Sequence, residues 1–423
     1  MFKTIKLKYL IDESNNYPIG DGDHGSISPD LYKEEGIPYI RVQNLSFHGQ
    51  LKYPGMTYIS EETHKNNLKS KIVPDDILIA KTGGTVGKLC LVPNKFNEYN
   101  TTSSVGKVTL DKNKLLPKFL IYFFQSGLMQ DLIKKISYQK SAQPGFNIDD
   151  LKEFKIACPE IINQQLIVEY LDKKIQKIDS LKNKTERKIE LLNEQKNALI
   201  NKYVTKGLNP NIELKDSGIE WIGHIPKHWE IHPVSKIFDE NKVKNALSRN
   251  DVLTLSYGKI KYRDLSKLDG LLPKSFDNYQ VMNVESIIIR STDLQNDHKS
   301  LRVGHVGIPG VITSAYLGLN PKLDIKTKFF YYSIHLADLK KILYGLGGGI
   351  RQSLRFEDFK KFPIISPPEK ERINISNHLD NIENQINDLI SKLSKKIDFL
   401  NEYRQSVISS IVTGKTEITE EML

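Results

Sequence analysis

The sequence contains one long segment twice, and this repeat limits the architectures that the chain can adopt. Residues 159–207 recur as residues 367–415, and each matching position lies 208 places further along the 423-residue chain. The dipeptide Leu171-Asp172 returns as Leu379-Asp380 under this offset. One fixed offset over such a length indicates that the chain consists of two related halves.

Both copies carry apolar residues at alternating steps of three and four positions. The first copy has Ile167, Leu171, Ile175, Ile178 and Leu181, and the second has Ile375, Leu379, Ile382, Ile386 and Leu389. This spacing predicts long amphipathic helices whose apolar seam is narrow enough for a coiled coil. Prolines near each start, and Gly207 and Gly414 near each end, fit the boundaries of helices. Because neither helix can bury its seam alone, we expect the two to form an antiparallel pair.

The repeat divides the chain into six parts. We expect a domain at residues 1–158, a helix at 159–207, a connector at 208–230, a second domain at 231–366, a second helix at 367–415 and a tail at 416–423. Short β-like runs between Gly, Pro and Asn turns alternate with helical runs at 118–136 and 327–344, which predicts an α/β pattern in each domain. The fold class is therefore α+β, with two α/β domains, an antiparallel coiled coil and a pseudo-twofold internal repeat. In the connector, we expect Trp221 and Trp229 to be held against a surface.

Composition points to a partner and a compartment. Lysine and arginine number 61 against 51 aspartates and glutamates, and this net charge of +10 favours a polyanionic partner such as nucleic acid. No run of apolar residues is long enough to span a membrane, and the start lacks a signal-peptide core, so a cytoplasmic protein is expected. Cys90 and Cys158 are too few for a disulfide framework or a cysteine metal site.

Three short motifs suggest chemistry, but their context disfavours it. The segment IGDGDHG matches a dinucleotide-binding glycine pattern, yet flanking prolines favour a turn. Asp21 and Asp23, with Asp75 or Asp76 and Lys81 downstream, could form a nuclease site, but their spacing fits no nuclease pattern. Prolines also interrupt any helix that would align His224, His228 and His232 as metal ligands.

Two glycine-rich segments remain candidates for DNA contact. TGGTVGK, residues 82–88, lacks the first glycine of a nucleoside triphosphate loop, and Leu89 replaces the residue that would hold magnesium. Its glycines and Lys88 could instead approach a DNA phosphate, or the segment is an ordinary basic hairpin. GLGGGIRQS, residues 345–353, presents Arg351 and Gln352, residue types that read guanine and adenine, or it is a solvated loop.

With these features in place, the chain resembles the specificity (S) subunit of type I restriction-modification enzymes over essentially its whole length. The resemblance is carried by the helix ends YVTKG and IVTGK and the connector SGIEWIGHIPKHWE. In the first domain it is carried by DGDHGS, GIPYIRVQNL and AKTGGTVGK, and in the second by VLTLSYGKIKYRDL, RSTDL, GVITSAY and RQSLRFEDFKKF. The chain departs from the pattern in lacking a connector before its first domain.

The resemblance implies two target recognition domains, each reading one half of a bipartite site in double-stranded DNA, with the helices as a ruler between them. It implies two methyltransferase (M) subunits that use S-adenosylmethionine, and restriction (R) subunits that use ATP and Mg. It also implies that this chain is not an enzyme and holds no catalytic, cofactor or metal site. The competing interpretation is a coiled-coil scaffold that binds other proteins, and a third is an enzyme in its own right.

Residue type and loop placement indicate which side chains contact DNA. In the first domain these are Arg41, Gln43, Asn44, Lys81, Thr82, Gly83, Gly84 and Lys88. In the second domain they are Tyr257, Lys259, Arg263, Arg290, Arg351 and Gln352.

Overall fold

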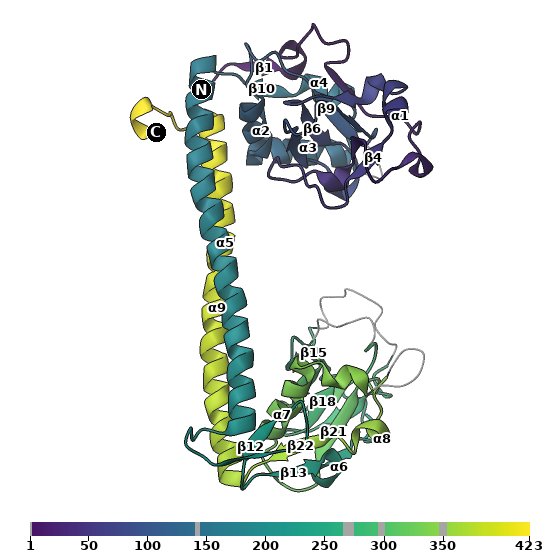
Figure 1. Ribbon diagram of the computed structural model, residues 1–423, viewed down its shortest axis with the longest axis vertical. Coiled ribbons are helices and arrows are strands. Elements are labelled where there is room, and N and C mark those ends of the chain that lie inside the picture. The colour runs from purple at the N-terminus through teal and green to yellow at the C-terminus, as the bar shows by residue number, and fades with distance from the viewer. Residues whose placement is uncertain (1, 140–143, 265–274, 295–300, 347–352) are drawn as a thin grey trace. The chain divides into compact units, whose positions relative to one another are not determined.

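Two helices of unusual length follow the repeated segments. In the computed structural model, α5 spans Ile161–Lys206 and α9 spans Glu369–Val412 (Figure 1). The structure describes residues 2–139, 144–264, 275–294, 301–346 and 353–423. The chain forms two compact units, Met1–Glu186 with Ser394–Leu423 and Arg187–Leu393, so each long helix contributes to both.

The apolar seam explains why α5 and α9 pair. In the first unit, Leu171 of α5 is buried in the same core as Ile408 of α9. In the second unit, Val204 of α5 is buried with Leu379 of α9. The start of each helix therefore packs beside the end of the other, which confirms the predicted antiparallel pair.

A glycine follows the end of each long helix, as predicted: Gly207 comes directly after α5, and Gly414 comes two residues after the last residue of α9. Gly207 has φ +70°, and its N–H donates to the Tyr203 carbonyl at 3.1 Å. Gly414 has φ +72°, and its N–H donates to the Ile411 carbonyl at 3.0 Å. Glycine adopts this left-handed backbone without steric cost, so it ends a helix and satisfies a terminal carbonyl at the same time.

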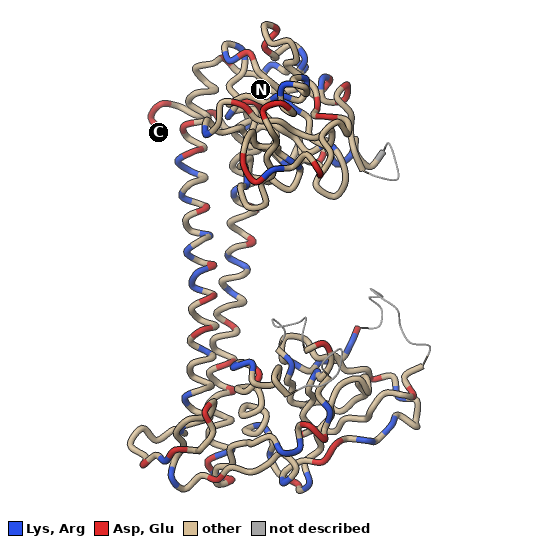
Figure 2. The backbone as a smooth tube through the Cα atoms, turned by 45° about the vertical axis from the view of Figure 1, so that its right-hand side comes forward, with Lys and Arg blue, Asp and Glu red and all other residues tan. Residues whose placement is uncertain are grey.

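Charged residues of both signs are distributed along the length of α5 and α9 (Figure 2). This pattern is typical of helices whose outer faces are solvated. Within the described parts of the chain, no helix combines the length and the apolar character that crossing a membrane requires.

The first unit carries a domain of small sheets. Its strands are β1 (Thr4–Lys6), β2 (Ile19–Asp21), β3 (Ile37–Ile40), β4 (Thr57–Ile59), β5 (Lys71–Ile72), β6 (Ile77–Ala80), β7 (Leu89–Leu91), β8 (Tyr99–Thr101), β9 (Val105–Val108) and β10 (Lys155–Ala157). Its helices besides α5 and α9 are α1 (Glu61–Lys65), α2 (Pro117–Gln125), α3 (Gly127–Gln139) and α4 (Ile148–Glu153). The sheets have the orders β2-β9-β6-β7, β4-β3-β8-β5 and β1-β10. The pairs are antiparallel except β3 with β8, a detail that local patterns do not determine.

The second unit carries the related domain and the connector. Its strands are β11 (Leu214–Asp216), β12 (His224–Pro226), β13 (Glu230–Pro233), β14 (Phe238–Glu240), β15 (Leu253–Ser256), β16 (Lys259–Tyr262), β17 (Gln280–Met282), β18 (Ile287–Ile289), β19 (Val303–His305), β20 (Gly310–Ile312), β21 (Leu317–Pro321) and β22 (Pro363–Ser366). Its shorter helices are α6 (Val234–Ile237), α7 (Lys328–Leu339) and α8 (Phe356–Phe359). The order β14-β21-β18-β19 repeats β2-β9-β6-β7, and β13-β22 repeats β1-β10. The predicted internal repeat is thus confirmed at the level of the sheets.

The same polar contact joins each domain to the long helices. In the first unit, Lys118 Nζ lies 2.5 Å from Asp172 Oδ2, and the Tyr122 hydroxyl donates to Asp172 Oδ1 at 2.7 Å. In the second unit, the equivalent residues are Lys328, Tyr332 and Asp380, with distances of 3.1 and 2.7 Å. Asp172 and Asp380 occupy matching positions in the repeat, so the repeat preserves this contact as well as the helices.

The two helical runs predicted inside the domains are each interrupted. Ser126 has φ −62° and ψ 146°, an extended backbone that separates α2 from α3. The N–H of Gly127, at the start of α3, donates to Ser409 Oγ of α9 at 2.9 Å, a tertiary contact that favours the break. In the second domain, Lys341 has φ +62° and separates α7 from the 3₁₀ helix η6 (Ile342–Gly345).

The connector is anchored by its two tryptophans, as expected. Trp229 is fully buried, and its Nε1–H donates to Glu371 Oε2 of α9 at 2.9 Å. Trp221 stacks on Phe362 with ring centroids 5.6 Å apart. These contacts fix the chain between the end of α5 and the first strand of the second domain.

Candidate nucleic-acid interface

Two predicted DNA-binding segments of the first domain lie side by side. The backbones of Ser46 and Leu89 exchange two hydrogen bonds, of 3.1 and 2.8 Å. Lys88 Nζ lies 5.9 Å from the centroid of the exposed Phe47 ring, within range of a cation–π contact. The loop after β3 and the β6–β7 hairpin therefore share one surface.

The glycine turn of the β6–β7 hairpin is open to approach. Gly83 has φ +73°, and its N–H donates to the Pro144 carbonyl at 2.8 Å. Within the ranges that the structure describes, a Cβ atom built on Gly83 or Gly84 would meet no atom within 4 Å. Gly84 is exposed, and Thr82 and Lys88 on either side are partly exposed. This turn can let a DNA backbone approach the main chain closely.

The predicted residues after β3 divide into exposed and internal groups. Gln43 is exposed, with Nε2 donating to the Gly55 carbonyl at 3.2 Å. Arg41 is half-buried, and its Nη2 donates to Thr57 Oγ1 at 2.6 Å. Asn44 is fully buried, and its amide accepts from the Arg41 N–H and donates to the Lys52 carbonyl, both at 3.0 Å. Asn44 therefore shapes the loop from inside.

Lys81 is also an internal residue in this structure. It is buried and forms an ion pair with Asp21, which in turn lies 3.1 Å from His24 Nε2. Lys81 thus joins β6 to the end of β2 beneath the glycine turn. Sequence reasoning placed it on the surface because its partner lies 60 residues away.

Of the aspartates in the nuclease interpretation, Asp21 forms this ion pair with Lys81, and the other three have partners of their own. Asp23 accepts from the backbone N–H groups of Gly25 and Ile27, at 3.0 and 3.1 Å, and so closes a turn. Asp75 pairs with Lys112 at 2.6 Å. Asp76 accepts from Thr109 Oγ1 at 2.6 Å, and burial raises the pKa of its carboxyl. Among the residues that the structure describes, no three His, Cys, Asp or Glu side chains form a group that could hold a metal.

In the second domain, the predicted residues concentrate on the β15–β16 hairpin. Tyr257 is 89% exposed at φ +49°, and Lys259 and Arg263 are exposed on the same hairpin. Arg290 lies apart, after β18, where its N–H donates to the Arg302 carbonyl at 2.8 Å. Arg351 and Gln352 lie outside the described residues.

A cavity of about 540 Å³ beside this hairpin contains residues that sequence reasoning missed. We call it the lysine cleft. Its polar lining includes Asn193, Lys196 and Asn197 of α5, Lys259 and Lys261 of β16, His335 of α7, and Glu383 and Asn387 of α9. Lys196 resembles any solvated helix residue in the sequence. The one feature of the sequence that could have singled it out is the repeat, which aligns Lys196 with Arg404.

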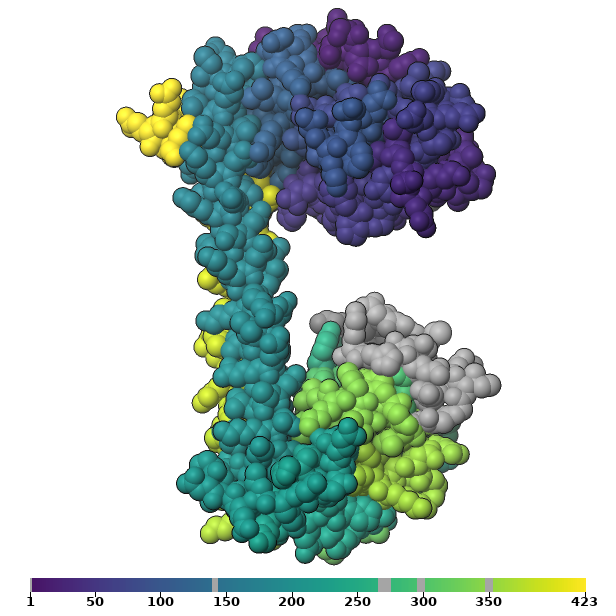
Figure 3. Space-filling view, viewed as in Figure 1, coloured from purple at the N-terminus to yellow at the C-terminus, as the bar shows by residue number. Residues whose placement is uncertain are grey.

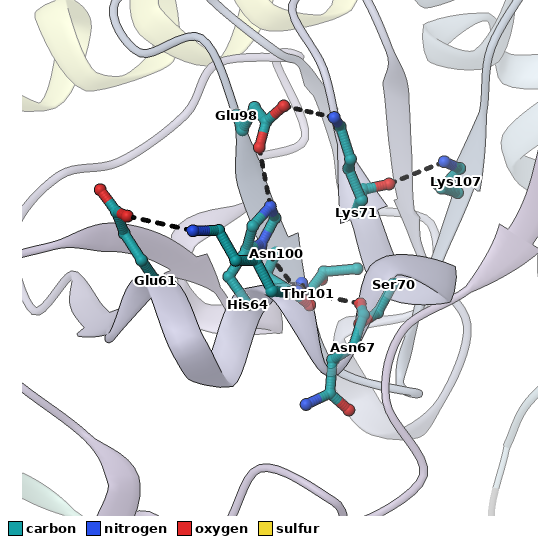
Figure 4. Close-up of polar contacts among 10 residues, drawn as sticks. Glu61, His64, Asn67, Ser70, Lys71, Glu98, Asn100, Thr101 and Lys107 are labelled. Carbon is teal, nitrogen blue, oxygen red and sulfur yellow. Dashed lines mark hydrogen bonds and ion pairs between the residues drawn. The ribbon is translucent and has the colours of Figure 1, made fainter.

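A second group of residues that the sequence did not suggest, which includes three lysines, borders a cavity of about 970 Å³ on the first domain. Figure 4 shows Lys71 paired with Glu98, which lies 2.9 Å from His64 Nε2, while Lys107 Nζ donates to the Lys71 carbonyl at 2.7 Å. The hydrogen bond from Lys71 holds the pKa of Glu98 below its usual range, and burial lowers the pKa of Lys107. These partners hold two lysines in the cavity wall, while Lys69 is exposed beside them.

Comparison with known proteins shows which family has this sequence pattern. Residues 23–191 and 226–398 each match the family described as type I restriction modification DNA specificity domain. The putative type I restriction enzyme MjaX specificity subunit of Methanocaldococcus jannaschii is 22% identical over 90% of this chain and 88% of its own length. The type I restriction enzyme EcoBI specificity subunit of Escherichia coli is 24% identical over 42% of this chain and 37% of its own length.

Solved structures share the fold. A chain solved in work on complex assembly and conformational transition of the type I R-M system has a TM-score of 0.71 at 12% identity, and the match covers 98% of each chain. The HsdS subunit from Thermoanaerobacter tengcongensis has a TM-score of 0.51 at 13% identity, with 98% of this chain and 97% of that one covered. The two family matches together cover most of this chain, one on each half of the repeat. The chain therefore belongs to the type I restriction modification DNA specificity domain family, whose members are the non-catalytic DNA-recognition subunits of type I restriction-modification enzymes.

Proposed function

We propose that this specificity subunit reads a bipartite site in double-stranded DNA, one half with each domain, and that α5 and α9 set the spacing of the halves. One observation carries the proposal. Two related domains use the same Lys–Tyr–Asp contact to the helix pair, but present different exposed loops. Two domains that contact the helices in the same way but expose different loops are suited to binding two different DNA sequences.

We assign the DNA contacts according to which of the predicted side chains are exposed. In the first domain we propose Gln43 as a base contact, with Thr82, Gly83, Gly84 and Lys88 following the phosphates. In the second domain we propose Tyr257, Lys259, Arg263 and Arg290, together with Arg351 and Gln352 from the sequence. Asn44 and Lys81 support their loops from inside, and Arg41 contributes through the same loop. The net charge of +10 supports binding to a polyanion.

The partner subunits are part of the proposal. Apolar residues remain exposed on the long helices: Leu181 of the seam by 47%, and Leu191 and Phe399, outside the seam, by 47% and 67%. On the face drawn in Figure 3, much of the surface of α5 is not covered by other elements. Such residues favour burial by another protein. We propose that two M subunits dock on the helices, and that R subunits join the complex. S-adenosylmethionine, ATP and Mg then belong to those partners.

Methylation mapping tests the proposal. The chain would be produced with its M partner, and modified adenines would be mapped across a genome by long-read sequencing. We expect two short defined sequences separated by a fixed undefined gap. A stable complex without any defined motif would instead favour the scaffold interpretation.

Matched variants would assign the two halves. Replacing Lys259 and Arg263 with alanine should relax one half of the motif only. Gln43→Ala should relax the other half only, because it lies in the first domain. If both sets altered the same half, the assignment of one half to each domain would be wrong.

A further inference from the structure

The lysine cleft differs from the equivalent place in the first unit. There, Arg404 of α9 is nearly buried, with Nε 3.4 Å from Asp179 Oδ1 of α5 and Nη1 donating to Gln125 Oε1 at 3.2 Å. A carboxylate and a neutral acceptor therefore contact this guanidinium within the chain, although its Nε makes no hydrogen bond among the described residues.

The repeat places Lys196 where Arg404 stands and Asn387 where Asp179 stands. Lys196 Nζ donates to Asn387 Oδ1 at 3.1 Å, so a neutral amide has replaced the carboxylate. Among the described residues that line the cleft, three lysines accompany a single carboxylate, that of Glu383. Glu383 is also an acceptor for the Tyr332 hydroxyl at 2.9 Å, so its charge is shared with another donor. The cleft keeps an excess of positive charge.

His335 supplies an independent sign of a missing partner. Its side chain is almost completely buried in the wall of the cleft, beside Tyr331, whose ring stacks on it at 5.5 Å. In the described part of the chain, its Nδ1 has no hydrogen-bond partner. A buried polar atom without a partner is costly, and a ligand with hydrogen-bonding oxygens would satisfy it.

We propose that the lysine cleft binds a phosphate group. Lys196, Lys259 and Lys261 supply the charge, and the amides of Asn193 and Asn197, one helical turn apart on α5, supply neutral donors. The cavity of about 540 Å³ has room for a group of this size.

A phosphodiester of bound DNA is the source that the surroundings favour. Tyr257 and Lys259 line the cleft and also belong to the hairpin that we propose reads DNA. A strand passing over this hairpin would bring its backbone to the mouth of the cleft. In this form the inference rests on the proposed function, whereas a free phosphorylated molecule would use the same cleft independently of it.

Charge-matched variants of the full chain test the inference. Asn387→Asp gives Lys196 the internal carboxylate that Arg404 has, without removing side-chain volume. Lys196→Met removes the charge and keeps the length. The control Asp179→Asn makes the opposite change at the equivalent place in the first unit. Thermal melting of each variant would verify folding, and Asn387→Asp should melt no lower than the unmodified chain.

Two probes distinguish the sources of phosphate. The first is a non-target DNA duplex, whose binding is followed by fluorescence anisotropy over a range of salt concentrations. If the phosphate belongs to DNA, Asn387→Asp and Lys196→Met should bind roughly tenfold more weakly at low salt. The slope of log affinity against log salt should fall by about 1, while Asp179→Asn causes no loss. The second probe is inorganic pyrophosphate, titrated calorimetrically in the absence of DNA.

Each result decides the inference. Unchanged DNA binding, with pyrophosphate bound by the unmodified chain and lost in Asn387→Asp, would assign the cleft to a free phosphorylated molecule. Unchanged binding of both probes in both cleft variants would overturn the inference. Neither result depends on base recognition, so a defined methylation motif could still be found after this inference had failed.

Discussion

At the scale of the residue, the two halves of the chain place different side chains around the cation that α5 or α9 contributes at equivalent positions, Arg404 in one and Lys196 in the other. Arg404, Asp179 and Gln125 form a neutralised group in the first unit, where the second unit has Lys196 and His335 in an incompletely neutralised cleft. The environment of His335 follows from this difference. Burial, assisted by the charge of Lys196, lowers the pKa of its imidazole to about 4.

This lowered pKa makes stability depend on pH in a definite direction. Below its ordinary pKa, near 6.5, the unfolded imidazole takes up a proton, while the folded one stays neutral down to about 4. The unfolded state binds more protons in that window, so stability should fall as the pH drops, by on the order of 3 kcal/mol in total. Gln125 and His335 each lie three residues after the equivalent tyrosines Tyr122 and Tyr332, so His335→Gln copies the first domain and should reduce this loss. Melting curves of both proteins from pH 7 to 4, in phosphate-free buffer, would check it, and equal losses would contradict it.

The hydroxyl of Tyr332 offers a second test at this scale. It is shared between Asp380 Oδ1 at 2.7 Å and Glu383 Oε2 at 2.9 Å, and burial followed by these carboxylates raises its pKa. Tyr332→Phe would leave two neighbouring carboxylates without this donor. We expect it to lower the free energy of unfolding by about 1.5–3 kcal/mol. Tyr138→Phe, at an exposed ring, is the control, and equal effects on melting would exclude the proposed role of the contact.

At the scale of the element, the long helices are stabilised unevenly along their seam. Leu171 is completely buried against the first domain and α9, whereas Leu181, on the same seam, is 47% exposed. The seam pattern alone predicts equal importance for both. The packing therefore decides which seam residues stabilise the isolated chain and which remain for a partner.

Alanine substitutions would measure this difference. Leu171→Ala should lower the free energy of unfolding by about 2–5 kcal/mol, because it leaves a cavity in a packed core. Leu181→Ala should change it by less than about 0.5 kcal/mol in the isolated chain. Both values would come from denaturant unfolding followed by circular dichroism. A loss at Leu181 as large as that at Leu171 would show that its exposed seam position is covered in solution.

The elements also show what a single sequence could and could not predict. The helices and their glycine ends follow from local periodicity, so they were predictable. The break at Ser126 was not, because the bond from Gly127 to Ser409 that favours it joins residues 282 positions apart. Burial of Lys81 was missed for the same reason, since its partner Asp21 lies 60 positions away. Asn44 bonds to Arg41 and Lys52 of its own loop, and its residue type alone suggested DNA contact. The lysine cleft forms where five separate segments of the chain meet, which no local pattern reveals.

At the scale of the whole molecule, the repeat links the fold to the proposed function. Two copies of a domain with a helix provide two readers and the antiparallel pair that joins them. Under this account, the gap between the half-sites depends on helix length, while the sequence of each half depends on one domain. The two properties should therefore change independently.

The most direct measurement is the recognition gap after both helices are shortened together. Removing residues 184–190 and 392–398 deletes one heptad at matching places of the repeat and preserves the apolar register. The deletion shortens each helix by roughly 10 Å, about the rise of three DNA base pairs. Long-read methylation mapping should then find both half-sites unchanged and the gap shorter by about three base pairs. An unchanged gap with both halves intact would contradict the account, because the helices would not set the spacing.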